Sequence, residues 1–170
     1  YPTVMWDETN AQNDGTIRRE TRFPGDPAEL IYQGPHIYVG NPLYKTPRAI
    51  CDTNLAHDPL DLTELPADYL PRTNYIRACD ARTYAQRTPR APWEGRPLLT
   101  TLPRLVHRKM LSQAGERTLA AALLPPGPAQ IITAIATAFR ETSTLLNTAA
   151  SFQSLVLDFM VKSTGKSDLT

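Results

Sequence analysis

Proline restricts what this chain can fold into more than any other residue type does. Sixteen of the 170 residues are proline, and nine of them lie between residues 41 and 103. Proline lacks a backbone N–H and fixes φ near about −65°, so it interrupts helices and the inner strands of sheets. Because no long periodic apolar stretch occurs in this segment, we expect long loops that are either draped over a core or built to contact a partner.

Apolar runs outside that segment indicate where strands can form. Residues 30–32 and 36–39 are short β-prone runs separated by a turn sequence. Residues 60–65 alternate with period two, which favours a half-buried strand or an extended segment. Residues 118–124 and 131–139 are apolar; propensity favours helix there and length equally fits buried strands. Both possibilities stay open for these two runs.

The clearest helix is expected over residues 141–162. Its apolar residues recur at spacings of three and four, and they are Leu145, Ala149, Phe152, Leu155, Val156, Phe159 and Met160. Residues 1–28 are polar and rich in turn formers, so we predict a poorly structured segment there and a folded domain over residues 29–170. The predicted fold is α+β: a small, mostly antiparallel sheet packed by one long C-terminal helix, with long proline-rich loops.

Basic residues are concentrated in the middle of the chain. The whole sequence has a net charge of only +1, yet residues 72–117 hold ten basic and three acidic residues, a net charge of +7. Tyr75, Tyr84 and Trp93 lie among the arginines. Arginine binds phosphates and guanine edges through paired donors, and aromatic rings stack on bases. The pattern favours nucleic-acid binding; a solvated and partly ion-paired surface is the alternative.

Several catalytic and metal-binding patterns are excluded or weak. Cys51 and Cys79 are too few for a disulfide framework or a four-cysteine zinc site, and we predict reduced thiols in a cytoplasmic protein. The three histidines lack ligand spacing, so no metal is expected. No serine lies in the frame typical of a hydrolase nucleophile. No apolar run is long enough to span a bilayer, and no membrane association is expected.

The segment Asn41-Pro42-Leu43-Tyr44 is similar to the Asn-Pro-Pro-Tyr tetrapeptide of amino-group DNA methyltransferases. In those enzymes the motif holds the exocyclic amine and stacks the flipped base. Leu43 replaces the second proline, and no glycine-rich turn for an adenosyl cofactor precedes the segment. We therefore interpret it as a proline turn after a strand. A standalone enzyme would require this turn to lie in a cofactor pocket.

Four longer stretches together resemble the C-terminal target-recognition region of large adenine-specific (N6) DNA methyltransferases. These are the type IIG and ISP, BREX-like and DISARM-like enzymes of bacterial restriction and phage-defence systems. The stretches are residues 37–48, residues 60–62 with 70–76, residues 104–108 leading to 116–127, and residues 155–166. The most specific runs from Glu116 to Gly127, where the family pattern is Glu-Arg-Thr-Leu-Ile-Ala-Ala-x-x-Pro-Pro-Gly.

The resemblance carries expectations about fold and activity. It implies a strand over residues 118–124 paired with residues 105–110, and a third strand over residues 130–139. It also implies that the S-adenosylmethionine site and the catalytic motif lie outside this chain. The sequence begins at Tyr1 without an initiator methionine, so we expect a fragment that binds no cofactor and is inactive alone.

The expected function is DNA target recognition for such a methyltransferase, with double-stranded DNA and the catalytic core as partners. Predicted backbone contacts are Arg72, Arg104, Arg108, Lys109, Lys162 and Lys166, and predicted base contacts are Asn74, Tyr75, Arg87 and Arg90. Arg117, beside a predicted strand, is the strongest single candidate. The alternative is a protein-interaction module that docks onto the methyltransferase core or another defence subunit, with its arginines paired to acidic residues.

Overall fold

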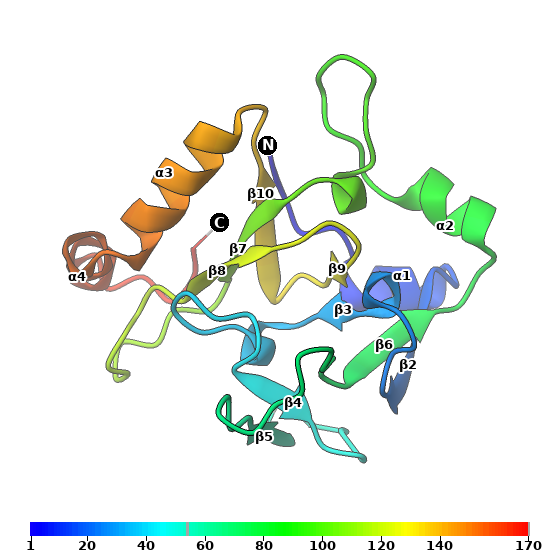
Figure 1. The fold of residues 1–170 in the computed structure, drawn as a ribbon, viewed down its shortest axis with the longest axis horizontal. Helices are drawn as coiled ribbons and strands as arrows, with labels where there is room; N and C mark the ends of the chain where they lie inside the picture. The colour runs from blue at the N-terminus through cyan, green and yellow to red at the C-terminus, as the bar shows by residue number, and fades with distance from the viewer. Residues whose placement is uncertain (54, 170) are drawn as a thin grey trace.

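A four-stranded antiparallel sheet forms the centre of the computed structural model, which describes residues 1–53 and 55–169 (Figure 1). Its strand order is β1 (Pro2–Thr3), β10 (Ala134–Ala138), β7 (Arg104–Arg108) and β8 (Ala121–Leu124). The two strands expected from the family resemblance therefore pair as predicted, and the third follows before the C-terminal helices. Residues 118–124 and 131–139 contribute strands and no helix.

Burial explains why the residues of β8 and β10 form strands although their intrinsic propensity favours helix. Ala121, Ala122, Ala134 and Ala136 are each fully buried. Side chains this small allow a strand to be covered on both sides, with Val106 of β7 directly opposite both Ala122 and Ala136. The packing thus selects an extended conformation that alanine alone would not favour.

Three two-stranded pairs surround this sheet. β2 (Ile17–Arg22) pairs antiparallel with β6 (Thr73–Arg77), with an irregularity between Arg19 and Arg22. β3 (Ile31–Tyr32) pairs parallel with β9 (Ala129–Gln130), and β4 (Lys45–Pro47) pairs antiparallel with β5 (His57–Pro59). The described part of segment 41–103 therefore contains three strands, one α-helix and one 3-10 helix as well as loops, and its strand β6 is largely buried.

In the part of the chain that the structure describes, four α-helices and three short 3-10 helices complete the fold. The α-helices are α1 (Glu8–Asn13), α2 (Ala81–Arg87), α3 (Thr142–Gln153) and α4 (Leu155–Ser163). The 3-10 helices are η1 (Pro27–Glu29), η2 (Gly34–His36) and η3 (Leu99–Thr101). Figure 1 shows α3 and α4 together on one flank of the sheet and α2 on the opposite flank. The α+β class is confirmed. No helix among the described residues is long and apolar enough to cross a membrane.

The prediction that residues 1–28 are poorly structured is wrong. This segment carries β1, α1 and β2, and it places Met5, Trp6, Ala11 and Ile17 in the largest hydrophobic cluster. These apolar residues are isolated among polar ones, so no periodic pattern marks them. Their burial depends on β2 pairing with β6, more than fifty residues away in sequence.

The single helix expected over residues 141–162 is two helices, separated at Ser154. The backbone of Ser154 is extended, and its hydroxyl accepts a hydrogen bond from Leu157 N at 3.2 Å while donating one to Ser151 O at 2.8 Å. Serine is a favoured N-cap because its oxygen satisfies a free amide of the first turn. The same residue therefore closes α3 and opens α4.

Two other expected extended segments are not strands. The run 36–39 begins inside η2, where His36 donates its backbone N–H to Gln33 O at 3.1 Å, and its Tyr38 forms only an isolated bridge with Asn41. Residues 60–65 form a turn in which Asp61 accepts hydrogen bonds from the amide and hydroxyl of Thr63. Local side-chain bonding replaces ladder pairing in that turn.

Candidate nucleic-acid interface

A groove of about 470 Å³ lies where η2, β4 and β5 meet the ends of the central strands. β7 contributes Arg108 at its last position, and Thr133 directly precedes β10. The lining residues are Gln33, Gly34, Pro35, Lys45, Leu55, His57, Arg108, Met110, Leu111, Ser112 and Thr133. The volume falls in the range of ordinary ligand pockets, and the lining holds basic, amide and hydroxyl groups but no carboxylate.

Gly34 fixes one wall of the groove against the central sheet. Its carbonyl accepts from Arg108 Nε at 2.8 Å, and its N–H donates to Thr133 Oγ1 at 3.1 Å. A Cβ on residue 34 would lie 3.0 Å from the carbonyl oxygen of Thr133, closer than ordinary packing allows. The absence of a side chain therefore permits η2 to approach both strands and holds Arg108 in place.

Two tyrosines and two cations form a compact cluster beside the groove. The rings of Tyr38 and Tyr44 stack with centroids 4.7 Å apart and planes inclined by 24°. Lys45 Nζ lies 5.1 Å and Arg108 Cζ 5.6 Å from the centroid of the Tyr44 ring. Cations at this distance from a tyrosine ring are held by its quadrupole. Tyr44 thereby positions both charges that line the groove.

The charges of Lys45 and Arg108 are not neutralised by acidic side chains. Ion pairs in the described part of the chain involve Arg18, Arg22, Arg48, Arg87 and Arg117, and neither groove cation is among them. Burial lowers the pKa of Arg108, and the nearby Tyr44 and Tyr38 hydroxyls raise it. A half-buried guanidinium without a counter-ion loses solvation without regaining it from a carboxylate, so the groove is suited to an anionic ligand.

The turn at Asn41 serves structure, as the sequence interpretation expected. Asn41 Oδ1 accepts from Leu43 N at 2.7 Å, and Tyr38 and Asn41 exchange backbone hydrogen bonds. Gly40 N donates to Ala121 O at 2.8 Å, which attaches this turn to the edge of β8. The Asn41 side chain therefore stabilises a local turn. The chain continues from this turn to Tyr44, which lies beside the groove, and to Lys45, which lines it.

Two histidines lie at the groove: His57 lines it, and His36 lies next to His57 in the core. The His36 ring is fully buried; Nδ1 accepts from Gln33 N, and Nε2 lies 3.0 Å from Arg72 O. Burial lowers the pKa of His36 to about 4, against the smaller opposing effect of its bond to Arg72 O. The His57 ring, which lines the groove, is 6.0 Å from the His36 ring. His36 is therefore neutral near pH 7 and acts as a hydrogen-bonded core residue.

Several residues predicted to bind DNA are instead engaged inside the protein. Arg104 is fully buried and donates to Gln130 Oε1, to Pro128 O and to Leu102 O. Tyr75 is buried with its hydroxyl bonded to Glu8, and buried Asn74 accepts from the Thr21 hydroxyl. In this conformation none of these three side chains is open to a nucleic acid, and each supports the packing of β6 or β7.

Arg117, the strongest single candidate from the sequence, also faces inward. Its Nε lies 3.4 Å from Asp158 Oδ2, and its Nη2 donates to Gln153 O at 2.9 Å. Only 14% of its side chain is exposed. Asp158 Oδ1 additionally accepts from the amides of Thr118 and Leu119. Arg117 therefore connects the segment before β8 to the C-terminal helices, and the prediction that it points to an anionic partner is wrong for this conformation.

The remaining predicted residues are more accessible but scattered. Arg87 donates to Asp14 O and to the Thr16 hydroxyl, and Arg90 donates to Arg96 O. Arg72 lies over the Phe23 ring at 4.3 Å, next to β4. The others are half-buried Lys109, half-buried Lys162 and exposed Lys166. Of all the predicted residues, only Arg108 lines the groove, so the basic segment 72–117 does not form one continuous face.

Sequence reasoning missed most of the groove. Lys45 lies outside the basic segment, and Gln33, Ser112 and Thr133 are unremarkable in sequence. The one usable signal was the Tyr44-Lys45 pair directly after the Asn-Pro turn, because an aromatic residue beside a lysine is a typical nucleic-acid contact pair.

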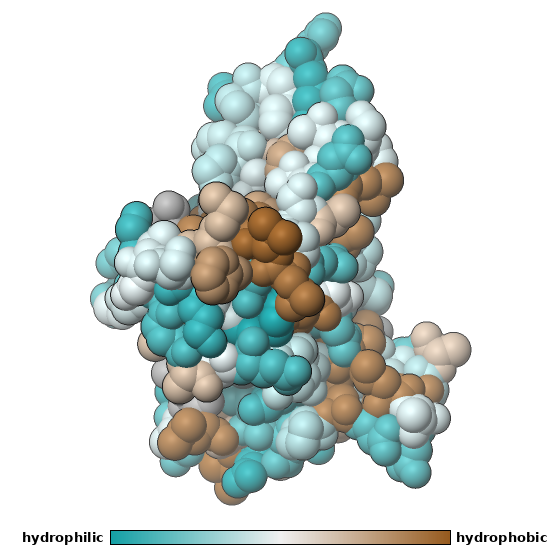
Figure 2. Space-filling view, turned by 90° about the vertical axis from the view of Figure 1, so that its left-hand side faces the viewer, coloured by the Kyte–Doolittle hydropathy of each residue, from teal (hydrophilic) through white to brown (hydrophobic). Residues whose placement is uncertain are grey.

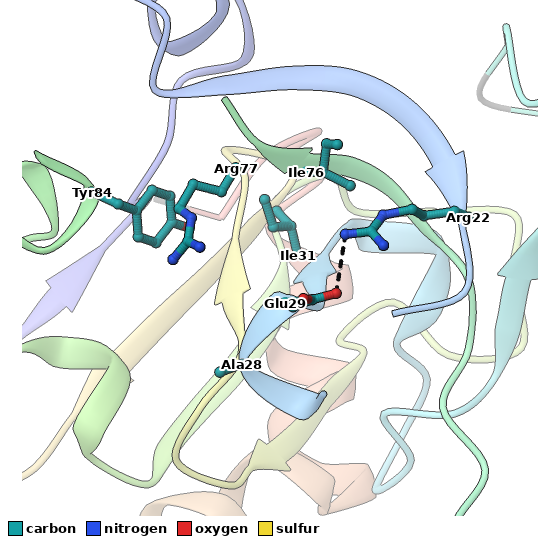
Figure 3. Close-up of a pocket in the computed structure, with 7 residues that line it drawn as sticks. All are labelled: Arg22, Ala28, Glu29, Ile31, Ile76, Arg77 and Tyr84. Carbon is teal, nitrogen blue, oxygen red and sulfur yellow. Dashed lines mark hydrogen bonds and ion pairs between the residues drawn. The ribbon is translucent and has the colours of Figure 1, made fainter. Parts of the chain in front are cut away.

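A second pocket, shown in Figure 3, is small and internally neutralised. It measures about 90 Å³ and is lined by Arg22, Ala28, Glu29, Ile31, Ile76, Arg77 and Tyr84. Arg22 Nη2 pairs with Glu29 Oε2 at 3.1 Å, and the Arg77 guanidinium lies over the Tyr84 ring. This volume suits a few water molecules, and the Arg22 charge already has its counter-ion.

The outer face of α4 is apolar, as Figure 2 shows for the flank that carries the C-terminal helices. Leu155, Val156 and Phe159 are each more than 70% exposed, and Met160 is 59% exposed. In contrast, Asp158 on the inner face is buried. This is the inverse of an ordinary surface helix, whose apolar stripe faces the core.

Comparisons with known proteins provide no assignment for this chain. No protein-family model matches it, and neither a curated protein nor a solved structure matches it.

Proposed function

We propose that this chain recognises DNA on behalf of an adenine-specific DNA methyltransferase, whose catalytic core and S-adenosylmethionine site lie outside it. The methyltransferase context comes from the sequence resemblance. One structural observation supports the DNA contact: Lys45 and Arg108 line a groove without carboxylates and have no ion-pair partners among the described residues. A surface that gathers unneutralised cations next to aromatic rings suits a phosphodiester backbone.

Paired charge-removal variants test this proposal. Lys45→Gln together with Arg108→Gln should weaken binding of a short fluorescein-labelled duplex by at least about tenfold in low salt, because two charge-assisted contacts are lost. Arg18→Gln with Arg140→Gln removes the same formal charge from β2 and from the segment that follows β10, and should change affinity little. Equal losses in both double variants would show non-specific attraction only, and no loss in either would refute a groove contact.

The exposed apolar face of α4 supports a second candidate function, docking onto the methyltransferase core. An exposed apolar cluster on a helix whose inner face is ionic is typical of a surface covered by another protein. Val156→Ser with Phe159→Ser should abolish association with the catalytic core and leave duplex affinity unchanged, whereas the groove variants should do the reverse. If the α4 variant associates normally, this face is not the docking surface.

A further inference from the structure

The groove is larger and its lining is more varied than contact with a duplex backbone requires. A bound phosphate needs only the two cations, Lys45 of β4 and Arg108 at the end of β7. The lining also holds the Gln33 amide, the Ser112 and Thr133 hydroxyls, and the apolar side chains of Met110 and Leu111. A base pair within a stacked duplex cannot enter a groove of about 470 Å³, so these groups would remain unused.

We infer that the groove binds one unstacked nucleotide, with its phosphate between Lys45 and Arg108 and its base against the Arg108 guanidinium and the apolar wall. The inference rests on the proposed function for DNA as the source of that nucleotide. Proteins that act on or read a single base extrude it from the stack and hold it by stacking and by hydrogen bonds to its edge.

Arg108 is suited both to binding the phosphate and to stacking on the base. Its Nε donates to Gly34 O and its guanidinium lies over the Tyr44 ring, so the group is held in a fixed orientation. Neither Nη atom of Arg108 makes a hydrogen bond within the described residues, so both NH₂ groups of the guanidinium can donate to phosphate oxygens. A planar guanidinium also stacks on bases, which an ammonium group does not.

The polar lining offers both donors and acceptors to a base edge. The Gln33 amide has one of each, and a hydroxyl such as that of Ser112 can act as either. Tyr44, stacked on Tyr38, gives the cluster its rigidity. An aromatic and guanidinium platform of this kind tolerates every base, because each base has a π-face. The occupant is therefore defined as a nucleotide, and not as one particular base.

The experiment titrates the intact chain with dAMP, with deoxyribose 5-phosphate and with inorganic phosphate. The Nε–Hε signal of Arg108 in a ¹⁵N-correlated spectrum is the readout, because its bond to Gly34 O protects that proton from exchange. We expect dAMP to shift the signal and to bind at least about fivefold more tightly than deoxyribose 5-phosphate, since stacking adds to phosphate binding. The Arg18 signal should not move.

Arg108→Lys separates stacking from charge. This variant should lose the preference for dAMP over deoxyribose 5-phosphate but retain phosphate binding, with titration followed on the Lys45 and Gly34 signals. Arg18→Lys, the same change at an exposed residue of β2 that does not line the groove, should behave as the wild type and serves as the control. Equal affinities of wild type for dAMP and inorganic phosphate would overturn the inference, because the groove would then be an anion site only.

The outcomes distinguish this inference from the proposed function. Duplex binding without any dAMP preference would leave DNA recognition standing and refute the nucleotide site. A dAMP preference without duplex binding would support the nucleotide site and refute DNA recognition. Tighter binding to a duplex with one bulged nucleotide than to the fully paired duplex, lost in Arg108→Lys, would support both.

Discussion

Arg104 and Arg108 are four residues apart on β7, and the fold gives them opposite roles. Arg104 is buried among the neutral acceptors Gln130 Oε1 and Pro128 O, and burial lowers its pKa to about 10. Arg108 stands at the end of the strand with its Nη atoms available. The sequence does not distinguish these two arginines. Only the folded structure shows that the Arg104 guanidinium lies in the core and that the Arg108 guanidinium lines the groove.

Replacing Arg104 by Ala should destabilise the fold. The change leaves several buried acceptors without donors, at a cost of about 1–3 kcal/mol for each buried group, so we expect a loss of at least about 3 kcal/mol in the free energy of unfolding. Urea denaturation measures it, with Arg18→Ala, an exposed residue of β2, as the control. A loss no larger than that of the control would show that the Arg104 bonds do not support the core.

Stability should fall as the pH is lowered through the range in which His36 titrates in the unfolded chain. The folded-state pKa of His36 is about 4 against an ordinary 6.5, so the unfolded state binds more protons between these values. Protonation then favours unfolding. From about pH 7.5 to about pH 5.0 the loss should be about 2 kcal/mol, at 1.36 kcal/mol per unit of pKa difference.

Urea denaturation at both pH values tests this dependence. His107, whose pKa burial also lowers, contributes in the same direction. His36→Gln should therefore show a smaller dependence on pH than the wild type, although some remains. An unchanged dependence in that variant would mean that His36 is not the group responsible.

At the scale of elements, α4 is held by one buried carboxylate. Asp158 accepts from the amides of Thr118 and Leu119 at 3.0 and 2.6 Å and lies beside Arg117. Asp158→Ala should cost about 3–5 kcal/mol, as expected when one partner of a buried pair is removed. Hydrogen exchange at the Leu119 amide should accelerate, and Asp158→Asn, which keeps an acceptor, should lose less.

An Asp158→Ala variant with wild-type protection at Leu119 would contradict the idea that this carboxylate anchors α4 to the segment before β8. The control is Ser163→Ala, a change at the exposed C-terminal end of the same helix.

The sequence was informative for elements with local or family-specific signals and uninformative for the others. The pairing of β7 with β8 followed from the resemblance around Glu116–Gly127, against helix propensity. The periodicity of residues 141–162 correctly indicated helix, but it also led to the expectation that Leu155, Val156 and Phe159 pack on the sheet. Asp158 takes the inward position instead, because two free amides and Arg117 surround it.

At the scale of the whole molecule, the groove could not be predicted because its parts come from five separate segments. Gly34, Lys45, His57, Arg108 and Thr133 become neighbours only when η2, the β4–β5 pair and the ends of β7 and β10 meet. The N-terminal segment was missed for the same reason, since its strand β2 needs the distant β6. Patterns in sequence report contacts within an element and carry little information on contacts between elements.

The molecule as a whole presents two chemically different surfaces. One is the basic groove with the tyrosine cluster beside it, and the other is the apolar face of α4 on the flank shown in Figure 2. This separation suits a chain that contacts a nucleic acid and a protein at once. It also means that the two proposed contacts can be removed independently, since Phe159 and Arg108 belong to different elements.

The salt dependence of duplex binding tests the central claim most directly. The logarithm of the association constant should fall linearly with the logarithm of salt concentration between about 50 and about 200 mM, and Lys45→Gln with Arg108→Gln should reduce the slope by about 2, one counter-ion for each lost phosphate contact. A wild-type affinity that does not respond to salt, or a slope that the double variant leaves unchanged, would contradict DNA recognition through this groove.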